Sequence, residues 1–277
     1  MNVNGKTKIT GIFGHPVGHT LSPAMHNAAF RSLGLNMCYI AFDVLPKDLP
    51  DAVKAVKSLN LLGVNITVPH KENVIPLLDD VNAEAKFMGA VNTVVNSEGK
   101  LTGYNTDGLG FMSSLAEAEI SSDGKTILII GAGGASRAIS YYLSRGKATD
   151  LLLYDIDRSK VKKLADDLNI SSDNKVSLLD DIENIGKPDI IINATPLGLN
   201  NEDPLPLDPG HLNSETVVYD LVYKNTKFLR EAKKKGAKTL DGSGMLLWQG
   251  VEAFRLWTGV GPPVDVMRQA LLSGMSK

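Results

Sequence analysis

Apolar positions follow two alternating patterns along most of the chain. Short continuous or alternating apolar runs predict strands, and runs with apolar residues three or four positions apart predict helices. The predicted strands are Ile9–Phe13, Tyr39–Val44, Val64–Val68, Thr126–Ile130, Leu151–Tyr154, Asp189–Asn193 and Thr216–Asp220. A hairpin is predicted from the runs 91–96 and 100–104, which flank Ser97-Glu-Gly99. Strands that alternate with helices favour parallel sheets covered by helices.

Start and stop signals place several of the helices. Ser22 is predicted as the N-cap of a helix with Pro23 at its first position, and Gly34 as the residue that ends it. The buried face of this helix is expected to hold Met25, Ala28, Ala29 and Leu33. Leu49, Val53 and Val56 mark a second helix, and Asp107 is expected to cap another that runs through Leu115.

The pattern changes after the polar turn 121–124. Thr126–Ile130 is apolar at four consecutive positions, as expected for a parallel strand covered on both faces. Tight strand–helix units follow, up to the turn 241–244. The helices from Met245 onward are expected to fold back onto the first half. These patterns indicate an α/β protein with more than one domain, in line with a length of 277 residues.

Charge and composition narrow the class of protein. The chain has 29 basic and 31 acidic residues and a net charge of −2, which argues against nucleic acid as a partner. The hydrophobic content of 43% excludes a disordered chain. The sequence has neither an apolar stretch of membrane-spanning length nor a signal peptide at its start, and its single cysteine, Cys38, cannot form an internal disulfide. We therefore expect a cytoplasmic protein, with no membrane partner; a homodimer stays open.

A glycine-rich turn follows the strand Thr126–Ile130. Gly131-Ala132-Gly133-Gly134-Ala135 lies between this strand and a predicted helix. Gly131 allows the tight turn, Gly133 lets the backbone approach a pyrophosphate, and the helix N-terminus attracts the anion. Ser136 occupies the third small position, where the motif has Gly or Ala. The strand–turn–helix context favours dinucleotide binding over a packing turn.

The residues after the next strand bear on the choice between NAD and NADP. Asp155 stands where a carboxylate accepts hydrogen bonds from the ribose hydroxyls and repels a 2′-phosphate. Asp157 adds to that repulsion, unless it only caps the next helix, whereas Arg158 and Lys160 oppose it. The charges alone lean modestly towards NAD.

Polar residues also gather just past predicted strands in the first half. In open α/β sheets, ligands bind beyond the carboxyl ends of the strands. Hydroxyl, amide, carboxylate and ammonium groups there could hold a small polyhydroxylated ligand, although each also has an ordinary role as a cap, a turn or a surface charge. Hydride transfer between an alcohol and a ketone further requires a proton carrier. Lys71 with Asp107 is the best candidate pair.

These segments together resemble one family, the shikimate dehydrogenases. The resemblance rests on Thr20-x-Ser22-Pro23, Asn65-x-Thr67-Val-Pro-x-Lys71, Gly89-Ala-Val-Asn92-Thr93, Asn105-Thr-Asp107-Gly108, the glycine turn, Asn193-Ala-Thr195-Pro196 and Gly244-Met-Leu-Leu-Trp-Gln249. It implies reversible NAD(P)-dependent reduction of 3-dehydroshikimate to shikimate, a step in aromatic amino-acid (chorismate) biosynthesis. It also implies a substrate-binding domain of residues 1–110, completed by 245–277, and a Rossmann-type domain of residues 111–244, with a cleft between them.

The resemblance also implies residue roles. Lys71 would be the catalytic acid/base and Asp107 its partner. The substrate carboxylate would be held by Thr20, Ser22 and Tyr223, and the substrate hydroxyls by Thr67, Asn92, Asp107 and Gln249. Gly131, Ala132, Gly133, Gly134 and Ala135 would bind the pyrophosphate, and Leu221 and Gly244 would lie near the nicotinamide. No metal-binding residues are expected.

Two positions depart from the family pattern. Thr20 replaces the usual Ser and adds a methyl group to the pocket. The usual phosphate-reading stretch Asn-Arg-Thr-x-x-Arg is here Asp155-Ile156-Asp157-Arg158-Ser159-Lys160, so Ile156 stands in the place of the Arg. The family habit of using NADP and the local charges therefore disagree, and both cofactors stay open.

Four other functions are weighed against this interpretation. Quinate dehydrogenase, or an enzyme for both substrates, shares the fold and chemistry. A non-catalytic nucleotide-sensing module would not need Lys71. A short-chain dehydrogenase would need a Tyr-x-x-x-Lys pair, which Tyr141, Tyr142, Tyr154 and Tyr219 do not form. A metal hydrolase is disfavoured because His15 and His19 lie in a Pro- and Gly-containing loop without a further ligand nearby.

Overall fold

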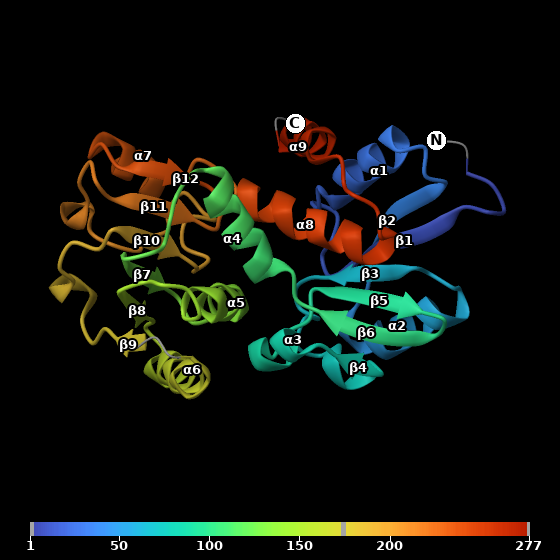
Figure 1. The fold of residues 1–277 in the computed structure, drawn as a ribbon, viewed down its shortest axis with the longest axis horizontal. Helices are drawn as coiled ribbons and strands as arrows, with labels where there is room; N and C mark the ends of the chain where they lie inside the picture. Colours follow the sequence, from blue (N-terminus) through green and yellow to red (C-terminus); the bar gives the residue numbers. More distant parts are fainter. Residues whose placement is uncertain (1–2, 173–175, 276–277) are drawn as a thin grey trace. The chain divides into compact units, whose positions relative to one another are not determined.

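The structure, a computed structural model, describes residues 3–172 and 176–275. It divides into two compact units. Unit 1 comprises Met1–Thr106 and Gln249–Lys277, and unit 2 comprises Asp107–Trp248. The first division falls between Thr106 and Asp107, and the second, between Trp248 and Gln249, falls inside a helix. Each unit is built on its own six-stranded sheet (Figure 1).

Unit 1 has a mixed sheet with the strand order β2-β1-β3-β5-β6-β4. The strands are β1 (Lys8–Gly14), β2 (Met37–Asp43), β3 (Gly63–Ile66), β4 (Asp80–Val81), β5 (Thr93–Ser97) and β6 (Lys100–Tyr104). β1 pairs in parallel with β2 and β3, and β5 runs antiparallel to β3 and β6. The predicted hairpin is confirmed as β5–β6. The predicted strand 64–68 was too long, because β3 ends at Ile66 and the chain then turns.

Helices of unit 1 cover both faces of this sheet. They are α1 (Ser22–Ser32), α2 (Leu49–Ser58), α3 (Ala83–Met88) and α9 (Val264–Met275), with single 3₁₀ turns at Pro46–Asp48 and Ile75–Leu77. Val64 and Ile66 of β3 pack with α2 and α3 in one core. Residues on the opposite face of the sheet, Tyr39 among them, meet aromatic residues of α1 and of α8 (Ser243–Thr258).

The sequence-based prediction for α1 was partly wrong. Leu21, without a side-chain cap, is the N-cap, and Ser22 is already helical. Leu33 is 38% exposed rather than buried, because the helix ends there. Gly34 then adopts a φ of 64°, which confirms it as the residue that terminates the helix. In α2, Leu49, Val53 and Val56 are all buried, as their spacing predicts.

Unit 2 has an all-parallel sheet with the order β12-β11-β10-β7-β8-β9. The strands are β7 (Thr126–Ile130), β8 (Asp150–Tyr154), β9 (Val176–Leu178), β10 (Ile190–Asn193), β11 (Val217–Asp220) and β12 (Lys238–Leu240). Counted from β7, this is the doubly wound order of the Rossmann fold. The α/β class and the Rossmann-type unit are thus confirmed. The short strands β4, β9 and β12 were not predicted.

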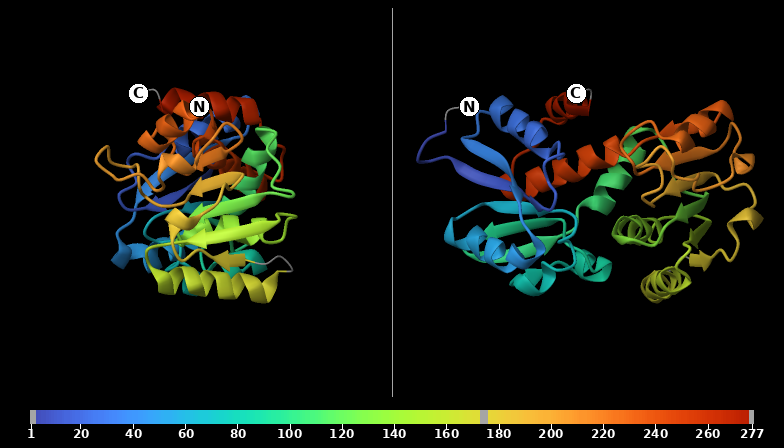
Figure 2. Two further views of the ribbon diagram at one scale, coloured as in Figure 1. Left: turned by 90° about the vertical axis from the view of Figure 1, so that its left-hand side faces the viewer. Right: turned by 180° about the vertical axis from the view of Figure 1, so that it is seen from behind.

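On one face of the unit 2 sheet, alternating residues of β7 pack against a helix. Leu128 and Ile130 pack with Phe228 and Leu229 of α7. The other helices of the unit are α4 (Asp107–Glu117), α5 (Gly134–Leu143), α6 (Arg158–Ser171) and α7 (Lys227–Lys234), with 3₁₀ turns at Ile182–Asn184 and Pro209–His211. α5 and α6 lie side by side (Figures 1 and 2). Asp107 is the first residue of its helix, which ends two residues beyond the predicted Leu115.

Candidate functional site

A cavity of about 520 Å³ opens around the glycine-rich turn of unit 2. It lies at the carboxyl ends of β7, β8 and β10, where α/β sheets bind ligands. The strand ends and the segment 182–208 supply its walls, which include Gly131, Ala132, Gly133, Tyr154, Asp155, Ile156, Lys160, Glu183, Thr195, Pro196, Leu205 and Asp208. The position and the mixed apolar and polar lining suit the adenosine half of a dinucleotide.

Gly131 is fixed by its surroundings. Its φ is 110°, a backbone conformation that is strained for any residue with a Cβ. A Cβ here would also lie 2.8 Å from the carbonyl oxygen of Ala194. Its N–H donates to the carbonyl oxygen of Tyr154 at 2.7 Å. The tight turn predicted for Gly131 is therefore present, and only glycine fits it.

The turn leads directly into the N-terminus of α5. Gly133 is the N-cap and carries no side chain that could accept from the first amides of the helix. A Cβ on Gly133 or on Gly134 would meet nothing within 4 Å. A helix N-terminus with uncapped amides and free space above it can receive a phosphate group. The residues present therefore fit a dinucleotide pyrophosphate.

Asp155 lies in the wall of this cavity, as the sequence predicts. One carboxylate oxygen accepts from the N–H of Ala132 at 2.6 Å, and the other accepts from the N–H of Asp157 at 2.8 Å. The carboxylate thus holds the glycine-rich turn against the end of β8. This bracing role was not foreseen, and it leaves lone pairs on both oxygens for a further donor.

Of the charged residues at positions 157, 158 and 160, only Lys160 lines the cavity. Asp157 is the N-cap of α6 and accepts from the N–H of Lys160 at 3.1 Å, so the helix-cap interpretation is confirmed. The hydrogen bond from Ser159, above all, lowers the pKa of Asp157. Arg158 donates to the carbonyl oxygen of Leu179 at 2.7 Å, whereas Lys160 lines the cavity. The side chain of Ile156 is almost fully exposed.

A buried polar cluster organises the ends of β10 and β11. Asn193 donates to a carboxylate oxygen of Asp220 at 2.9 Å, and the hydroxyl of Thr226 donates to the other oxygen at 2.7 Å. Burial raises the pKa of Asp220. Leu221 follows this cluster directly, and Gly242 packs against its carbonyl group. The segment leading to Gly244 therefore lies beside Leu221.

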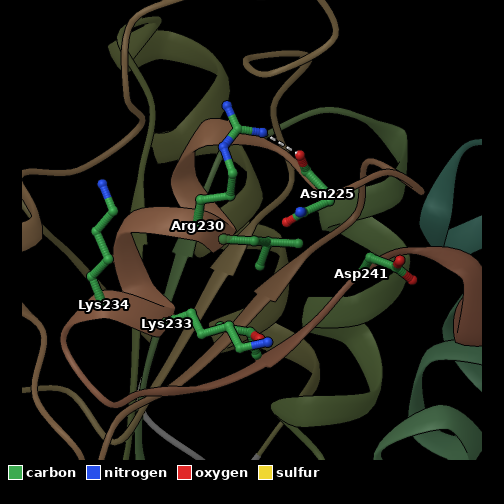
Figure 3. Close-up of a pocket in the computed structure, with 7 residues that line it drawn as sticks. Asn225, Arg230, Lys233, Lys234 and Asp241 are labelled. Atoms are coloured by element: carbon green, nitrogen blue, oxygen red, sulfur yellow. Dashed lines mark hydrogen bonds between the residues drawn. The ribbon is translucent and has the colours of Figure 1, made fainter.

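A second hollow of about 450 Å³ lies between α7 and β12. Figure 3 shows Arg230 turned toward Asn225, whose carbonyl oxygen accepts from the guanidinium at 2.6 Å, and Asp241 at the other side. Lys233 and Lys234 at its rim are exposed, and Lys234 pairs with Glu231 at 2.8 Å. The hollow shares no lining residue with the cavity at the glycine turn.

In unit 1, Lys71 lies in a turn that is tied down on both sides. The imidazole of His70, just before it, bonds the carbonyl oxygen of Val44 at 2.7 Å. The carbonyl oxygen of Lys71 accepts from the N–H of Val91 at 2.8 Å. The side chain of Lys71 is half-buried. These contacts fix the backbone from which the ammonium group extends.

The hydroxyl residues of unit 1 surround the ends of β1 and β3. Thr67 follows β3, donates its N–H to the carbonyl oxygen of Phe13 at 2.9 Å, and packs its methyl group over Gly14. The hydroxyls of Thr20 and Ser22 lie 3.3 Å apart at the start of α1. Thr20 thus lies in the loop between β1 and α1, Ser22 is the first residue of α1, and Thr67 contacts the end of β1 at Gly14.

Asn92 and Gln249 complete the set in unit 1. The carbonyl oxygen of Asn92 accepts from the N–H of Ile66 at 2.8 Å, which places Asn92 next to the end of β3. Gln249 lies on α8 next to Gly250, which packs directly against Met25 and His26 of α1. Of the predicted substrate and catalytic residues, Thr20, Ser22, Thr67, Lys71, Asn92 and Gln249 belong to unit 1, and Asp107 and Tyr223 belong to unit 2.

Several residues of these sites were missed by the predictions from sequence. The side chains of Asn65, Thr93 and Thr106 bond Asn92 or its neighbours inside unit 1. In unit 2, the segments 182–183 and 205–208 supply part of the cavity wall. Asn65 is part of the motif Asn65-x-Thr67-Val-Pro-x-Lys71, but the sequence alone assigned it no role. No sequence motif marks the segments 182–183 and 205–208 as part of the site. They line the cavity only because the folded chain passes beside it.

Two absences hold for the residues described. In the ranges 3–172 and 176–275, no group of three or more His, Cys, Asp or Glu side chains is arranged to hold a metal ion. Within the same part of the chain, no helix combines the length and apolarity that crossing a membrane requires.

Family models match three segments of the chain. Residues 12–94 match the shikimate dehydrogenase substrate binding domain, residues 114–198 match shikimate / quinate 5-dehydrogenase, and residues 242–272 match the shikimate 5'-dehydrogenase C-terminal domain. These segments contain most of the residues described above, from both units.

Known proteins match over nearly the whole length. Shikimate dehydrogenase (NADP(+)) of Desulforamulus reducens is 46% identical, with 99% of this chain and 98% of the relative covered. A crystal structure of a shikimate dehydrogenase in complex with NADP+ matches with a TM-score of 0.92 and 40% identity, covering 100% of this chain and 98% of the other. Shikimate 5-dehydrogenase from Listeria monocytogenes, in complex with shikimate and NAD, matches with a TM-score of 0.91 and 38% identity, covering 97% and 98%. The chain therefore belongs to the shikimate dehydrogenase family of oxidoreductases.

Proposed function

We propose that this protein catalyses the reversible reduction of 3-dehydroshikimate to shikimate, a step of aromatic amino-acid biosynthesis, with NADP or NAD as cofactor. The observation that carries the proposal is the presence, on one chain, of a cavity at a glycine-rich turn and of a lysine turn beside hydroxyl and amide side chains. The curated relative that is 46% identical is a shikimate dehydrogenase (NADP(+)).

Each unit has its own part in this proposal. Unit 1 binds the substrate, in agreement with the substrate-binding family model over residues 12–94. Thr20 and Ser22, with Tyr223 from unit 2, hold the carboxylate through their hydroxyls, which donate well to an anion. Thr67, Asn92, Asp107 and Gln249 hold the ring hydroxyls, because such side chains both donate and accept.

Unit 2 binds the dinucleotide, which supplies or accepts the hydride when it is bound. The turn Gly131, Ala132, Gly133, Gly134 and Ala135 would hold the pyrophosphate. The N–H groups of Gly131 and Ala132 are used by Tyr154 and Asp155, so the donors to the pyrophosphate would be the N–H groups of Gly133, Gly134 and Ala135 at the start of α5. Asp155 keeps this turn in place and offers its remaining lone pairs to the ribose. Lys160 faces the same cavity, and Arg158 begins the helix beside it. Leu221 and Gly244 border the nicotinamide.

Lys71 carries the proton in the proposed mechanism. In the reductive direction its ammonium group gives a proton to the carbonyl oxygen, and in the oxidative direction its amine takes the proton from the alcohol. Asp107 stabilises the charged lysine and orients it, since a carboxylate favours the ammonium form. The tied turn around Lys71 fixes the direction from which the proton arrives.

One assay tests the proposal. Purified protein is given shikimate or quinate, each with NADP and with NAD, and the formation of reduced nicotinamide is followed. We expect a higher kcat/KM for shikimate than for quinate. A preference for quinate would make the protein a quinate dehydrogenase. Dinucleotide binding without any turnover would make it a non-catalytic nucleotide-binding module.

A further inference from the structure

A chain of buried hydrogen bonds inside unit 1 begins at Tyr39 and leads to a proposed substrate residue. The hydroxyl of Tyr39, on β2, donates to the amide oxygen of Asn65, on β3, at 2.7 Å. Tyr39 is 1% exposed, so this interaction lies out of contact with solvent. The phenol therefore anchors Asn65 from the far side of β1.

The chain continues from Asn65 to Asn92. The amide nitrogen of Asn65 donates to the hydroxyl of Thr93 at 3.0 Å and to the carbonyl oxygen of Asn92 at 3.1 Å. The hydroxyl of Thr93 donates to the amide oxygen of Asn92 at 2.9 Å. The amide nitrogen of Asn92 donates to the hydroxyl of Thr106 at 3.0 Å. An unbroken series of buried polar groups thus runs from Tyr39 to Asn92.

Tyr39 is held in place by contacts that do not involve its hydroxyl. The side chain of Asn27 accepts from the N–H of Tyr39 and donates to its carbonyl oxygen, both at 2.9 Å. The imidazole of His26 stacks on the phenol ring, with centroids 4.5 Å apart and planes 11° apart. The hydroxyl therefore projects from a rigid ring, and burial raises its pKa, which keeps it a neutral donor.

The amide side chain of Asn65 has little freedom to rotate, because its oxygen and its nitrogen are both hydrogen-bonded. Its amide oxygen accepts from Tyr39, and both hydrogens of its amide nitrogen are used. Removing the Tyr39 hydroxyl would leave a buried acceptor without its donor, and a partly satisfied buried network loses its single arrangement. The amide of Asn65 could then rotate, and Thr93 and Asn92 would follow.

We propose that Tyr39 is a positioning residue for the substrate, which fixes Asn92 through Asn65 and Thr93. This inference rests on the proposed function, in which Asn92 binds a ring hydroxyl. Tyr39 does not touch the substrate in this scheme. It sets the position of the amide group that receives the hydroxyl.

The first test is Tyr39→Phe, which keeps the stacked ring and removes only the hydroxyl. We expect the KM for shikimate to rise about tenfold, in keeping with the loss of one buried hydrogen bond, while the KM for the cofactor stays unchanged. The matched control is Asn27→Ala, which removes both side-chain bonds to the Tyr39 backbone. It should lower the Tm and leave the KM for shikimate unchanged, because the hydroxyl chain remains.

A second variant keeps the inference falsifiable if Tyr39→Phe does not fold. Asn65→Ala breaks the same chain one step further on and should also raise the KM for shikimate. The double variant should be no worse than Asn65→Ala alone, because both act through one chain. A KM for shikimate unchanged in a folded Tyr39→Phe, or additive effects in the double variant, would overturn the inference. Failure of the proposed function would show separately, as wild-type protein that does not turn over shikimate.

Discussion

The two units build their sites in different ways. The cavity of unit 2 depends on the backbone: a glycine with a φ of 110°, an uncapped helix start, and a carboxylate that braces both. The residues of unit 1 act through side chains that come from separate segments and share a buried hydrogen-bond chain. A site formed by the backbone depends on a few residues that are adjacent in the sequence. A side-chain site of this kind exists only after the sheet has formed.

The largest expected effect concerns the side-chain site. Lys71→Ala should lower kcat by about a hundredfold to ten-thousandfold, the range for loss of a general acid or base. The dissociation constant for the cofactor should be unchanged, because the dinucleotide cavity belongs to unit 2. Steady-state kinetics and titration of the cofactor by fluorescence measure both quantities.

The exposed Lys54, which pairs with Asp51 at 3.0 Å, provides a matched control for Lys71. Lys54→Ala should leave kcat as it is. If Lys71→Ala kept most of its turnover, the assignment of Lys71 as the proton carrier would be wrong.

The next effect separates strain from ligand contact within the glycine-rich turn. Gly131→Ala should lower the free energy of unfolding by about 1–3 kcal/mol, because the new Cβ meets the Ala194 carbonyl oxygen and the φ is positive. Gly133→Ala meets no atom within 4 Å and should fold normally, yet it should weaken cofactor binding. Urea unfolding and cofactor titration distinguish the two. Unchanged cofactor affinity in Gly133→Ala would argue against a pyrophosphate at this turn.

A third prediction concerns the core beneath the side-chain site. His26 is fully buried, its ring nitrogens have no hydrogen-bond partner among the residues that the structure describes, and burial lowers its pKa from 6.5 to about 3. The unfolded chain therefore binds the proton more readily, and stability falls as the pH drops through 6.5 towards 3. At pH 5 this group should cost about 2 kcal/mol relative to neutral pH.

Replacement of His26 tests this dependence. Between pH 7 and pH 5, the free energy of unfolding of His26→Phe, measured by urea unfolding, should fall by about 2 kcal/mol less than that of the wild type. An identical decline in wild type and His26→Phe would contradict the prediction.

The smallest expected effect lies at the edge of the backbone site, where a side chain selects the cofactor. Ile156 is 91% exposed, so it can be replaced without loss of core packing. Ile156→Arg should lower the KM for NADP about tenfold, through a charge-assisted bond to the 2′-phosphate, and leave the KM for NAD nearly unchanged. Ile156→Gln, of similar length and without charge, is the control. Equal effects on NADP and NAD would show that residue 156 does not face the phosphate.

Much of the fold was predictable because local patterns agree with the final structure. The strand Thr126–Ile130, the glycine turn after it and the hairpin around residues 97–99 all appear where expected. The errors have local physical causes. Leu33 has helical spacing and is nevertheless exposed at the helix end, and Ser22 has the chemistry of an N-cap but lies one residue inside the helix. The two-residue strand β4 is too short for any periodic pattern.

The sequence by itself determined the class of fold, the dinucleotide turn and the family, because each depends on residues close together in the chain. The roles of Tyr39, Asn65 and Asp155 were decided only by the tertiary structure. Tyr39 and Asn65 are far apart in the chain and meet because their strands flank β1, and Asp155 braces a turn that lies one strand away. Hydrogen bonds of this kind depend on distances that appear only when sheets bring distant segments together, so the local pattern cannot encode them.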